Sequence, residues 1–486
     1  MHEIITLSFS QRSNCIATHL YNVAESRLQN VNDEFVDNSV LLESKPGQFG
    51  GTINYYPRAL LWDYNNGFGS LNPSEYFESK PDVEALKKLY PNVVTTGPST
   101  LKNQYQKALD QGTKTEGLAN SSDMRCWSDY SRVIYRPESL LKLNRWDYSF
   151  EHCNGYLRSH PEIQFGTYDV GVDEFSDEES VTGAEAVEEN FRKVLEECDT
   201  LTGLNVITEG DTAWGGFSSE FLSMIRDEYI SGSPIVTWSL KKNVGWQSLP
   251  VFDRMSRIKT LRSLSSVSSL YIPLNTESSI AQQCAKKHST WAISSYQSVI
   301  LDSLMTLLSQ RKNRWSMGDF VNGLTRGNEK RKIVTSSIIN DHNISPERMF
   351  ESTNSSNAHG SHVFARSVIN RPLPGKQTGL NENELREVCG FEDLINNGAD
   401  SLNLKAYNIV EPFDNRLDSF PEEFRKQEFS WCSFDITNKP QRCFGEMADY
   451  ISRYCKNDER EELKEDLSSM EEQYYWADES SDTDYE

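Results

Sequence analysis

Few of the residue patterns that carry enzyme chemistry are present in this chain of 486 residues. It contains no GxxxxGKS/T phosphate loop, no HExxH zinc helix and no GxSxG nucleophile turn. His359 and His362 have a spacing that can hold a metal ion, but no third ligand stands nearby. We therefore expect a surface loop there and no metal site. The remaining candidate is a glycine-bearing loop, Gly210–Gly216, between a predicted strand and a predicted helix.

Hydrophobic periodicity predicts the elements that position this loop. A buried strand is expected at Met1–Gln11 and a helix over Arg12–Val23. The further predicted elements are a strand at Arg58–Asp63, a helix over Ala184–Cys198, a strand at Leu204–Ile207, a helix over Ser218–Tyr229, a strand at Pro234–Ser239 and a helix over Thr290–Leu308. Alternating strands and helices are typical of a mostly parallel sheet, whose ligand crevice lies at the carboxyl ends of the strands.

Two acidic segments stand out in a chain of net charge −23. Residues Asp169–Glu188 are predicted to be an acidic linker. The segment Asn457–Glu486 holds 13 acids against Arg460 and Lys464, which predicts a disordered, solvated tail or a docking segment for a basic partner. This charge balance disfavours direct nucleic-acid binding.

The remaining composition indicates a folded protein without a membrane span. No apolar run approaches the roughly 18 residues that a membrane helix needs. The start, MHEIITLSFSQ, is neither a signal peptide nor an amphipathic presequence, which predicts folding in the cytosol. Nine scattered cysteines without a CxxC pair indicate reduced core thiols.

Two segments resemble tubulin. Ser10-Gln-Arg-Ser-Asn-Cys-Ile16 is similar to the first nucleotide loop, where Gly-Gln-Cys-Gly-Asn-Gln-Ile is expected. Cys198-Asp-Thr-Leu-Thr-Gly-Leu204, followed by the glycine loop and Ile225-Arg-Asp-Glu-Tyr229, resembles a second tubulin stretch. Other segments look like the Misato family of tubulin-like proteins: Trp127-Ser-Asp-Tyr130, Ser268-Ser-Leu-Tyr-Ile-Pro-Leu274 and Asp418-Ser-Phe-Pro421. The chain is thus similar to the Misato family from residue 1 to about 430.

The resemblance implies a degenerate nucleotide pocket. The residues it carries over to this pocket are Gln11, Arg12, Asn14, Asp63, Gly210, Gly215 and Gly216. Where tubulin has GGGTGSG, Asp211 brings a carboxylate beside the phosphate position and Trp214 brings bulk, so we expect Trp214 to fill the emptied pocket. Ser10 and Ser13 replace glycines, and Asp253–Leu264 lacks the asparagine that reads guanine. No catalytic residue and no cofactor are expected, although GTP binding without hydrolysis stays open.

The resemblance also predicts the fold and the function. We expect an α/β, tubulin-like fold with a mostly parallel Rossmann-like sheet flanked by helices, then a smaller α+β domain and the acidic tail. The predicted divisions are residues 1–120 as the Misato segment II part, 121–275 as the rest of the nucleotide-binding-type domain, 276–455 as the C-terminal domain and 456–486 as the tail.

For function, the resemblance implies a non-catalytic protein for partitioning of mitochondria and inheritance of mitochondrial DNA. It would lie peripherally on the cytosolic face of mitochondria and in the cytoplasm, through a surface receptor or cytoskeletal or chaperonin proteins. A divergent GTP-binding protein and a tubulin- or chaperonin-associated assembly factor are the alternatives.

Overall fold

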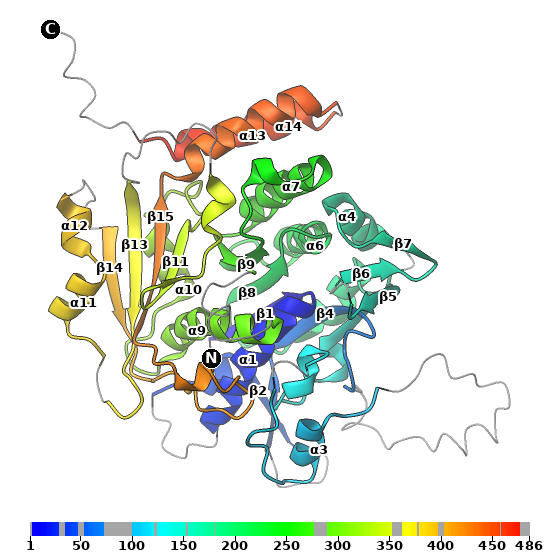
Figure 1. Ribbon diagram of the computed structural model, residues 1–486, viewed down its shortest axis with the longest axis vertical. Coiled ribbons are helices and arrows are strands. Elements are labelled where there is room, and N and C mark those ends of the chain that lie inside the picture. The colour runs from blue at the N-terminus through cyan, green and yellow to red at the C-terminus, as the bar shows by residue number, and fades with distance from the viewer. Residues whose placement is uncertain are drawn as a thin grey trace.

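The computed structural model describes twelve stretches of the chain. They are residues 2–28, 35–46, 53–71, 100–120, 124–151, 154–178, 180–276, 289–351, 362–376, 379–396, 403–456 and 458–476. Two sheets with helices around them form the molecule, and the chain passes from the first sheet to the second after residue 275 (Figure 1). The predicted α/β architecture, a mostly parallel sheet followed by a smaller C-terminal sheet, is confirmed.

The first sheet has eight strands in the order β10-β9-β8-β1-β4-β5-β6-β7. Their bounds are β1 Glu3–Phe9, β4 Ala59–Asn65, β5 Leu140–Ser149, β6 Asn154–Leu157, β7 His160–Gln164, β8 Leu201–Glu209, β9 Ile235–Lys241 and β10 Leu270–Asn275. Strands β10 to β5 are parallel, whereas β5, β6 and β7 pair antiparallel. Every residue of β1 is buried, as expected for the central strand of a sheet covered on both faces.

Chain order reverses around β1. The next strand of this sheet, β4, pairs with one edge of β1, and β8 pairs with the other edge. Such a reversal opens a crevice at the carboxyl ends of the strands, where α/β proteins bind ligands. Residues 10–14, 63 and 209–211 therefore meet at one edge of the sheet.

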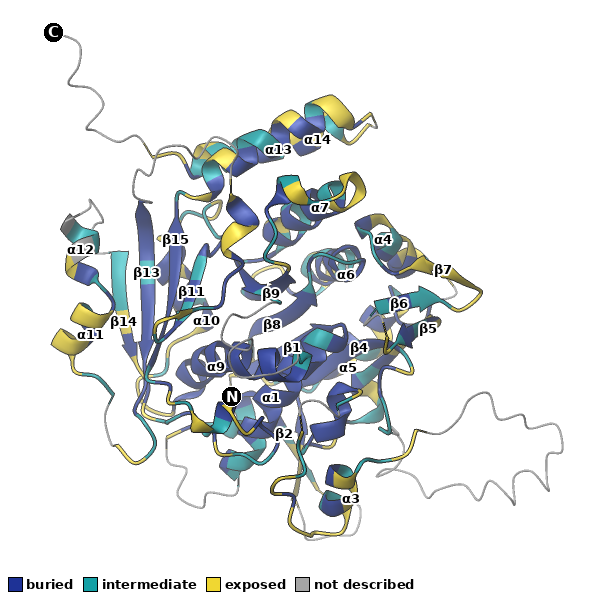
Figure 2. Cartoon of the chain, viewed as in Figure 1, coloured by how far each residue is buried: buried dark blue, intermediate teal, exposed yellow. Residues whose placement is uncertain are grey.

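Helices cover both faces of this sheet. The described helices are α1 Gln11–Leu28, α3 Gln104–Asp110, α4 Tyr168–Ser176, α5 Arg192–Glu196, α6 Trp214–Glu228, α7 Val251–Val267, α9 Thr290–Ser309, α10 Met317–Thr325, α11 Glu382–Val388, α12 Phe391–Asn396, α13 Pro440–Tyr454 and α14 Arg460–Gln473. Helix α9 packs on α1 and on the second sheet, and all its residues from Trp291 onward are buried. Figure 2 shows it in dark blue at the centre of the molecule. None of the described helices is long and apolar enough to cross a membrane.

The second sheet has five strands in the order β12-β11-β15-β13-β14. Their bounds are β11 Ser336–Ile339, β12 His342–Asn343, β13 Val363–Asn370, β14 Leu404–Asn408 and β15 Trp431–Thr437. A separate ribbon joins β2 (Leu42–Pro46) to β3 (Ile53–Pro57). A buried ion cluster links the two halves, because Asp302 of α9 accepts from Arg27 of α1 at 2.7 Å and from Arg371, just after β13, at 3.0 Å.

The structure corrects two expectations about the acidic segments. Asp169–Glu188 is no linker, because α4 packs against α6 and a Cβ on Gly171 would collide with the carbonyl of Ala213. Glu174 is buried there and accepts from the indole of Trp146 at 2.8 Å.

The tail predicted to be disordered from residue 456 contains α14. Helix α14 packs on α13 and α7, with Leu463 and Leu467 buried. Apolar residues at that four-residue spacing stabilise the helix despite its charge. Residues 477–486 lie outside the described residues.

Candidate functional site

Asp63, in β4, is the centre of the predicted pocket, and its side chain has no exposed surface. Its Oδ1 accepts from the backbone N–H of Tyr64 at 2.8 Å. Its Oδ2 accepts from the indole of Trp127 at 2.8 Å and from the amide of Asn14 at 3.3 Å. With the side-chain nitrogen of Gln11 turned toward the carboxylate, Gln11 also donates to Oδ2 at 2.6 Å. Both carboxylate oxygens are thus occupied by donors of the protein itself.

The environment of the Asp63 carboxylate makes the binding of an anion such as phosphate unfavourable. Burial, together with the nearby carboxylate of Glu209, raises the pKa of Asp63 to about 7 despite the hydrogen bonds that lower it. The turn after β4 covers the group from outside, because a Cβ on Gly67 would collide with it. A phosphate placed here would face two carboxyl groups in a buried setting, where like charges repel strongly.

The first predicted phosphate loop forms hydrogen bonds between its own residues. Ser10, between β1 and α1, has a φ of +114°, a conformation that glycine adopts at lower cost. Its hydroxyl accepts the backbone N–H of Ser13 at 3.1 Å, and its carbonyl accepts that of Asn14 at 2.9 Å. Ser10 therefore caps α1 in the way that serine commonly does. The N–H group of Ser13, which a phosphate would need at a helix N-terminus, already has a partner.

The second predicted loop also uses its N–H groups internally. Gly210 donates to Leu240 at 3.0 Å, Ala213 to Phe165 at 3.4 Å and Gly215 to Thr212 at 3.1 Å. Helix α6 begins at Trp214, four residues before the predicted start, so the last three residues of the glycine loop are helical.

Trp214 lies in the aromatic core of the first domain with no exposed surface. Its indole N–H donates to the hydroxyl of Tyr64 at 2.7 Å. Its ring centroid lies 5.1 Å from those of both Tyr64 and Phe165 and 5.7 Å from that of Phe217. The bulk that replaces a glycine is accommodated by three other aromatic rings.

The predicted glycines serve packing between elements. A Cβ on Gly215 would lie 2.6 Å from Thr260 of α7, and one on Gly216 would collide with the carbonyl of Tyr168 at the start of α4. Gly210 lies against Ser239 and Lys241 of β9. The structure therefore brings Gln11, Asn14 and Asp63 into contact but leaves these glycines facing other neighbours.

Asp211 is held by cations. It receives Arg257 of α7 at 2.7 Å and 2.9 Å and the backbone N–H of Lys242 at 2.7 Å, and Lys241 lies 3.4 Å away. Burial alone would raise the pKa of Asp211, but Lys241 and Arg257 hold it at about 2. The same burial lowers the pKa of Lys241 to about 8. Asp211 thus forms a buried ion cluster between β8, β9 and α7.

Sequence reasoning missed four residues of this region: Tyr64, Trp127, Lys241 and Arg257. Trp127 was quoted only as part of a family-like segment, although an indole N–H suits a buried carboxylate. The cationic partners of Asp211 follow from its position after a buried strand, since a carboxylate there needs opposite charge. Arg12, at the start of α1, is half-buried.

No group of three or more histidine, cysteine or acidic side chains that could hold a metal ion occurs within the described residues. His359 lies outside them, and His362 stacks on Trp476 with ring centroids 3.5 Å apart. At the sheet edge, the carboxylate of Asp63 and the N–H groups of Ser13, Gly210, Ala213 and Gly215 are hydrogen-bonded within the protein.

Comparisons with known proteins agree with this fold. The Misato Segment II tubulin-like domain matches residues 2–111, and a Tubulin domain matches residues 117–311. Protein DML1 of Debaryomyces hansenii is 39% identical over 57% of this chain and 59% of its own length, and Protein DML1 of Scheffersomyces stipitis is 36% identical over 57% and 56%. These matches span a little over half of each relative. Protein DML1 of Kluyveromyces lactis is 28% identical over the whole of both chains. The chain belongs to the Misato family of tubulin-like proteins.

Proposed function

We propose that this protein is a non-catalytic, tubulin-like factor for the partitioning of mitochondria and the inheritance of mitochondrial DNA. The observation that carries the non-catalytic part is the closed cluster around Asp63, in which Gln11, Asn14 and Trp127 satisfy a buried carboxylate. A hydrolase needs open donors and an ordered water at this edge. Here N–H groups of both tubulin-type loops are hydrogen-bonded to other groups of the protein instead.

Support for the mitochondrial part comes from the Misato resemblance alone. We propose that the protein meets mitochondria peripherally on their cytosolic face and is also present in the cytoplasm. A surface receptor, or cytoskeletal or chaperonin proteins, would be its partners. The net charge of −23 favours a basic protein partner over nucleic acid.

The nucleotide content of the purified full chain tests the non-catalytic part. Protein isolated without added nucleotide is denatured, and released guanine nucleotide is quantified by ion-exchange chromatography. We expect less than about one tenth of a GTP or GDP per chain and no phosphate release from GTP above that of a heat-denatured control. GTP hydrolysis that Arg12→Ser abolishes would refute the proposal and favour a divergent GTPase.

Depletion in cells tests the mitochondrial part. We expect daughter cells that receive too few mitochondria and lose mitochondrial DNA before microtubules change. Protease added to intact mitochondria should digest the bound protein. Full protection from protease would contradict the cytosolic face. Microtubule loss before any mitochondrial defect would instead favour an assembly factor for tubulin.

A further inference from the structure

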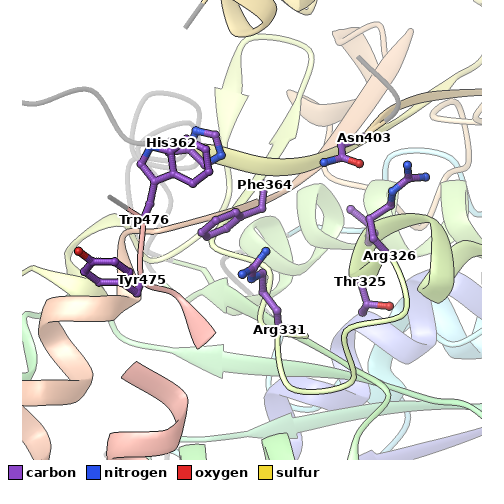
Figure 3. A pocket seen from close by; sticks show the side chains of 9 residues that line it. Thr325, Arg326, Arg331, His362, Phe364, Asn403, Tyr475 and Trp476 are labelled. Atoms are coloured by element: carbon purple, nitrogen blue, oxygen red, sulfur yellow. The ribbon is translucent and has the colours of Figure 1, made fainter. Parts of the chain in front are cut away.

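A cavity of about 390 Å³ lies far from the Asp63 cluster, beside the second sheet (Figure 3). Its walls come from the turn after α10, the start of β13, the residue before β14 and the segment after α14. In Figure 3, Arg326, Thr325 and Asn403 lie on one side, and Arg331, Phe364 and Trp476 lie on the other. Its volume falls within the usual range for small-molecule sites.

Arg331 is a half-buried cation without a counter-ion among the described residues. Its Nε donates to the carbonyl of Gln473 at 2.8 Å, and its guanidinium lies 3.7 Å above the ring of Phe364. No described carboxylate lies within ion-pair distance, and burial lowers the pKa of Arg331. Cations are rarely buried without a partner, so an anion bound beside this guanidinium would complete its environment.

Arg326 supplies a second cation on the opposite wall. It is exposed, follows α10 in the left-handed conformation with a φ of +55°, and has no ion pair with a described carboxylate. Two guanidinium groups that flank one cavity match the oxygens of a phosphate, which arginine binds through parallel N–H groups.

The rest of the wall suits a planar ring. Trp476 stacks on His362 with an interplanar angle of 4°, and 42% of its surface stays exposed. Asn403 places an amide, which both donates and accepts, beside the cavity. An amide can hydrogen-bond to the polar edge of a heterocyclic base, whereas a phenyl ring has no donor or acceptor for such a bond.

We propose that this cavity binds a small phosphorylated heterocycle of the nucleoside monophosphate class. The phosphate lies between Arg326 and Arg331, the base contacts the aromatic wall, and Asn403 reads the edge of the base. Each further phosphate would bring more negative charge to a protein of net charge −23, which favours one phosphate over three. The site is separate from the tubulin-type edge of the first sheet.

Calorimetric titration of the full chain tests this assignment with GMP, AMP, guanosine and inorganic phosphate as probes. We expect saturable binding of GMP or AMP, and binding at least tenfold weaker for guanosine and for phosphate. Arg326→Asn keeps a residue that tolerates the left-handed conformation and should weaken binding at least tenfold. Trp476→Ala should weaken it several-fold. Arg453→Asn is the matched control, because Arg453 is an exposed arginine on α13 and its loss should change nothing.

Three results would overturn the proposal. One is the lack of saturable binding with either monophosphate at millimolar concentration. Another is binding that Arg12→Ser removes and Arg326→Asn leaves intact, because the ligand would then lie at the sheet edge. The third is phosphotyrosine binding more tightly than both nucleotides, which would assign the cavity to a phosphorylated peptide.

Discussion

Trp214 is buried and Trp476 is partly exposed, and the charged groups near the two tryptophans also differ in whether they have a partner. Trp214 has no exposed surface and donates to Tyr64, whereas 42% of Trp476 is exposed. Asp211 is neutralised by Arg257, whereas Arg331 has no described counter-ion. In the first region, at the edge of the first sheet, the carboxylates of Asp63 and Asp211 therefore have partners within the chain. In the second, the cavity beside the second sheet, Arg331 has no counter-ion among the described residues.

The difference bears on our proposal that the sheet edge holds no nucleotide. An emptied polar crevice leaves unpaired donors and acceptors, which cost free energy. At the sheet edge, Ser10, Trp127 and Trp214 each form a hydrogen bond with another group of the chain. We expect substitutions there to reduce stability, and substitutions in the cavity to reduce binding with little effect on stability.

The largest expected effect is that of Trp214→Ala. It removes a fully buried ring and leaves the Tyr64 hydroxyl without its donor, so the free energy of unfolding should fall by about 4–5 kcal/mol. Urea denaturation measures this value. Trp315→Ala is the control, because Trp315 is 37% exposed and packs edge-on against Tyr407. If Trp214→Ala and Trp315→Ala lowered the free energy of unfolding equally, the buried tryptophan would contribute no more to stability than a partly exposed one.

The second largest effect is expected for Asp211→Ala, which should lower the free energy of unfolding by about 3 kcal/mol at pH 7. The substitution leaves Arg257 and Lys241 buried without their carboxylate, and a broken buried pair is more costly than a surface pair. The folded-state pKa of about 2 lies below the unfolded value, so the contribution of Asp211 is present above pH 4 and is lost toward pH 2.

Urea titrations of the wild type and of Asp211→Ala at pH 2.5 and 7 measure how the contribution of Asp211 to the free energy of unfolding changes with pH. Asp449→Ala, which removes an exposed partner of Arg453, should change stability by less than about 0.5 kcal/mol. A loss for Asp211→Ala that is no larger than this would show that the cluster is neutralised in another way.

The sequence predicts four of the eight strands of the first sheet, β1, β4, β8 and β9, because these strands are short, apolar and separated by helical patterns. The predicted helix over Thr290–Leu308 matches α9 within one residue. The acidic segments could not be predicted in this way. Buried Glu174 accepts a hydrogen bond from Trp146, which lies on a separate strand. Helix α14 packs on α13 and α7, and these contacts cannot be inferred from its own sequence. Tertiary packing therefore decides where local charge suggests a solvated chain.

The candidate site could be predicted only in part, because its partners Tyr64, Trp127, Lys241 and Arg257 belong to no loop pattern. Gln11, Asn14 and Asp63 follow from matching a known loop pattern, and the structure places them in contact. Whether they hold a nucleotide stays a prediction. The cavity beside the second sheet combines residues 325–331, 362–364, 403 and 475–476, so no local motif could indicate it.

Asp63→Asn should change how stability depends on pH. The pKa of Asp63 is about 7 in the folded protein and about 4 when unfolded, so the folded form keeps a proton that the unfolded form has lost. Stability from this group therefore falls as pH rises from about 4 to 7, by at most about 1.4 kcal/mol per pH unit. The variant lacks this slope. His19, whose pKa burial lowers to about 3, has the opposite slope in both proteins and cancels in the difference.

Urea denaturation at pH 5, 6, 7 and 8 measures the difference between the wild type and Asp63→Asn. We expect the wild type to lose stability relative to the variant up to pH 7 and to hold a constant difference above it. A difference that stays constant from pH 5 to 8 would show that Asp63 is already ionised at pH 5, and that the sheet edge tolerates more negative charge than the closed cluster implies.

Ser10→Gly should have the smallest effect and restores the residue that the tubulin pattern has at this position. Glycine relieves the positive φ of +114° but removes the hydroxyl that accepts from Ser13. The two effects oppose each other, so unfolding free energy should change by less than about 1 kcal/mol. Nucleotide binding at the sheet edge should not return, because Asp63 stays enclosed and Gly210, Ala213 and Gly215 keep their internal partners. If the single substitution Ser10→Gly produced GTP binding that Arg12→Ser removes, one residue rather than the whole edge would control the site.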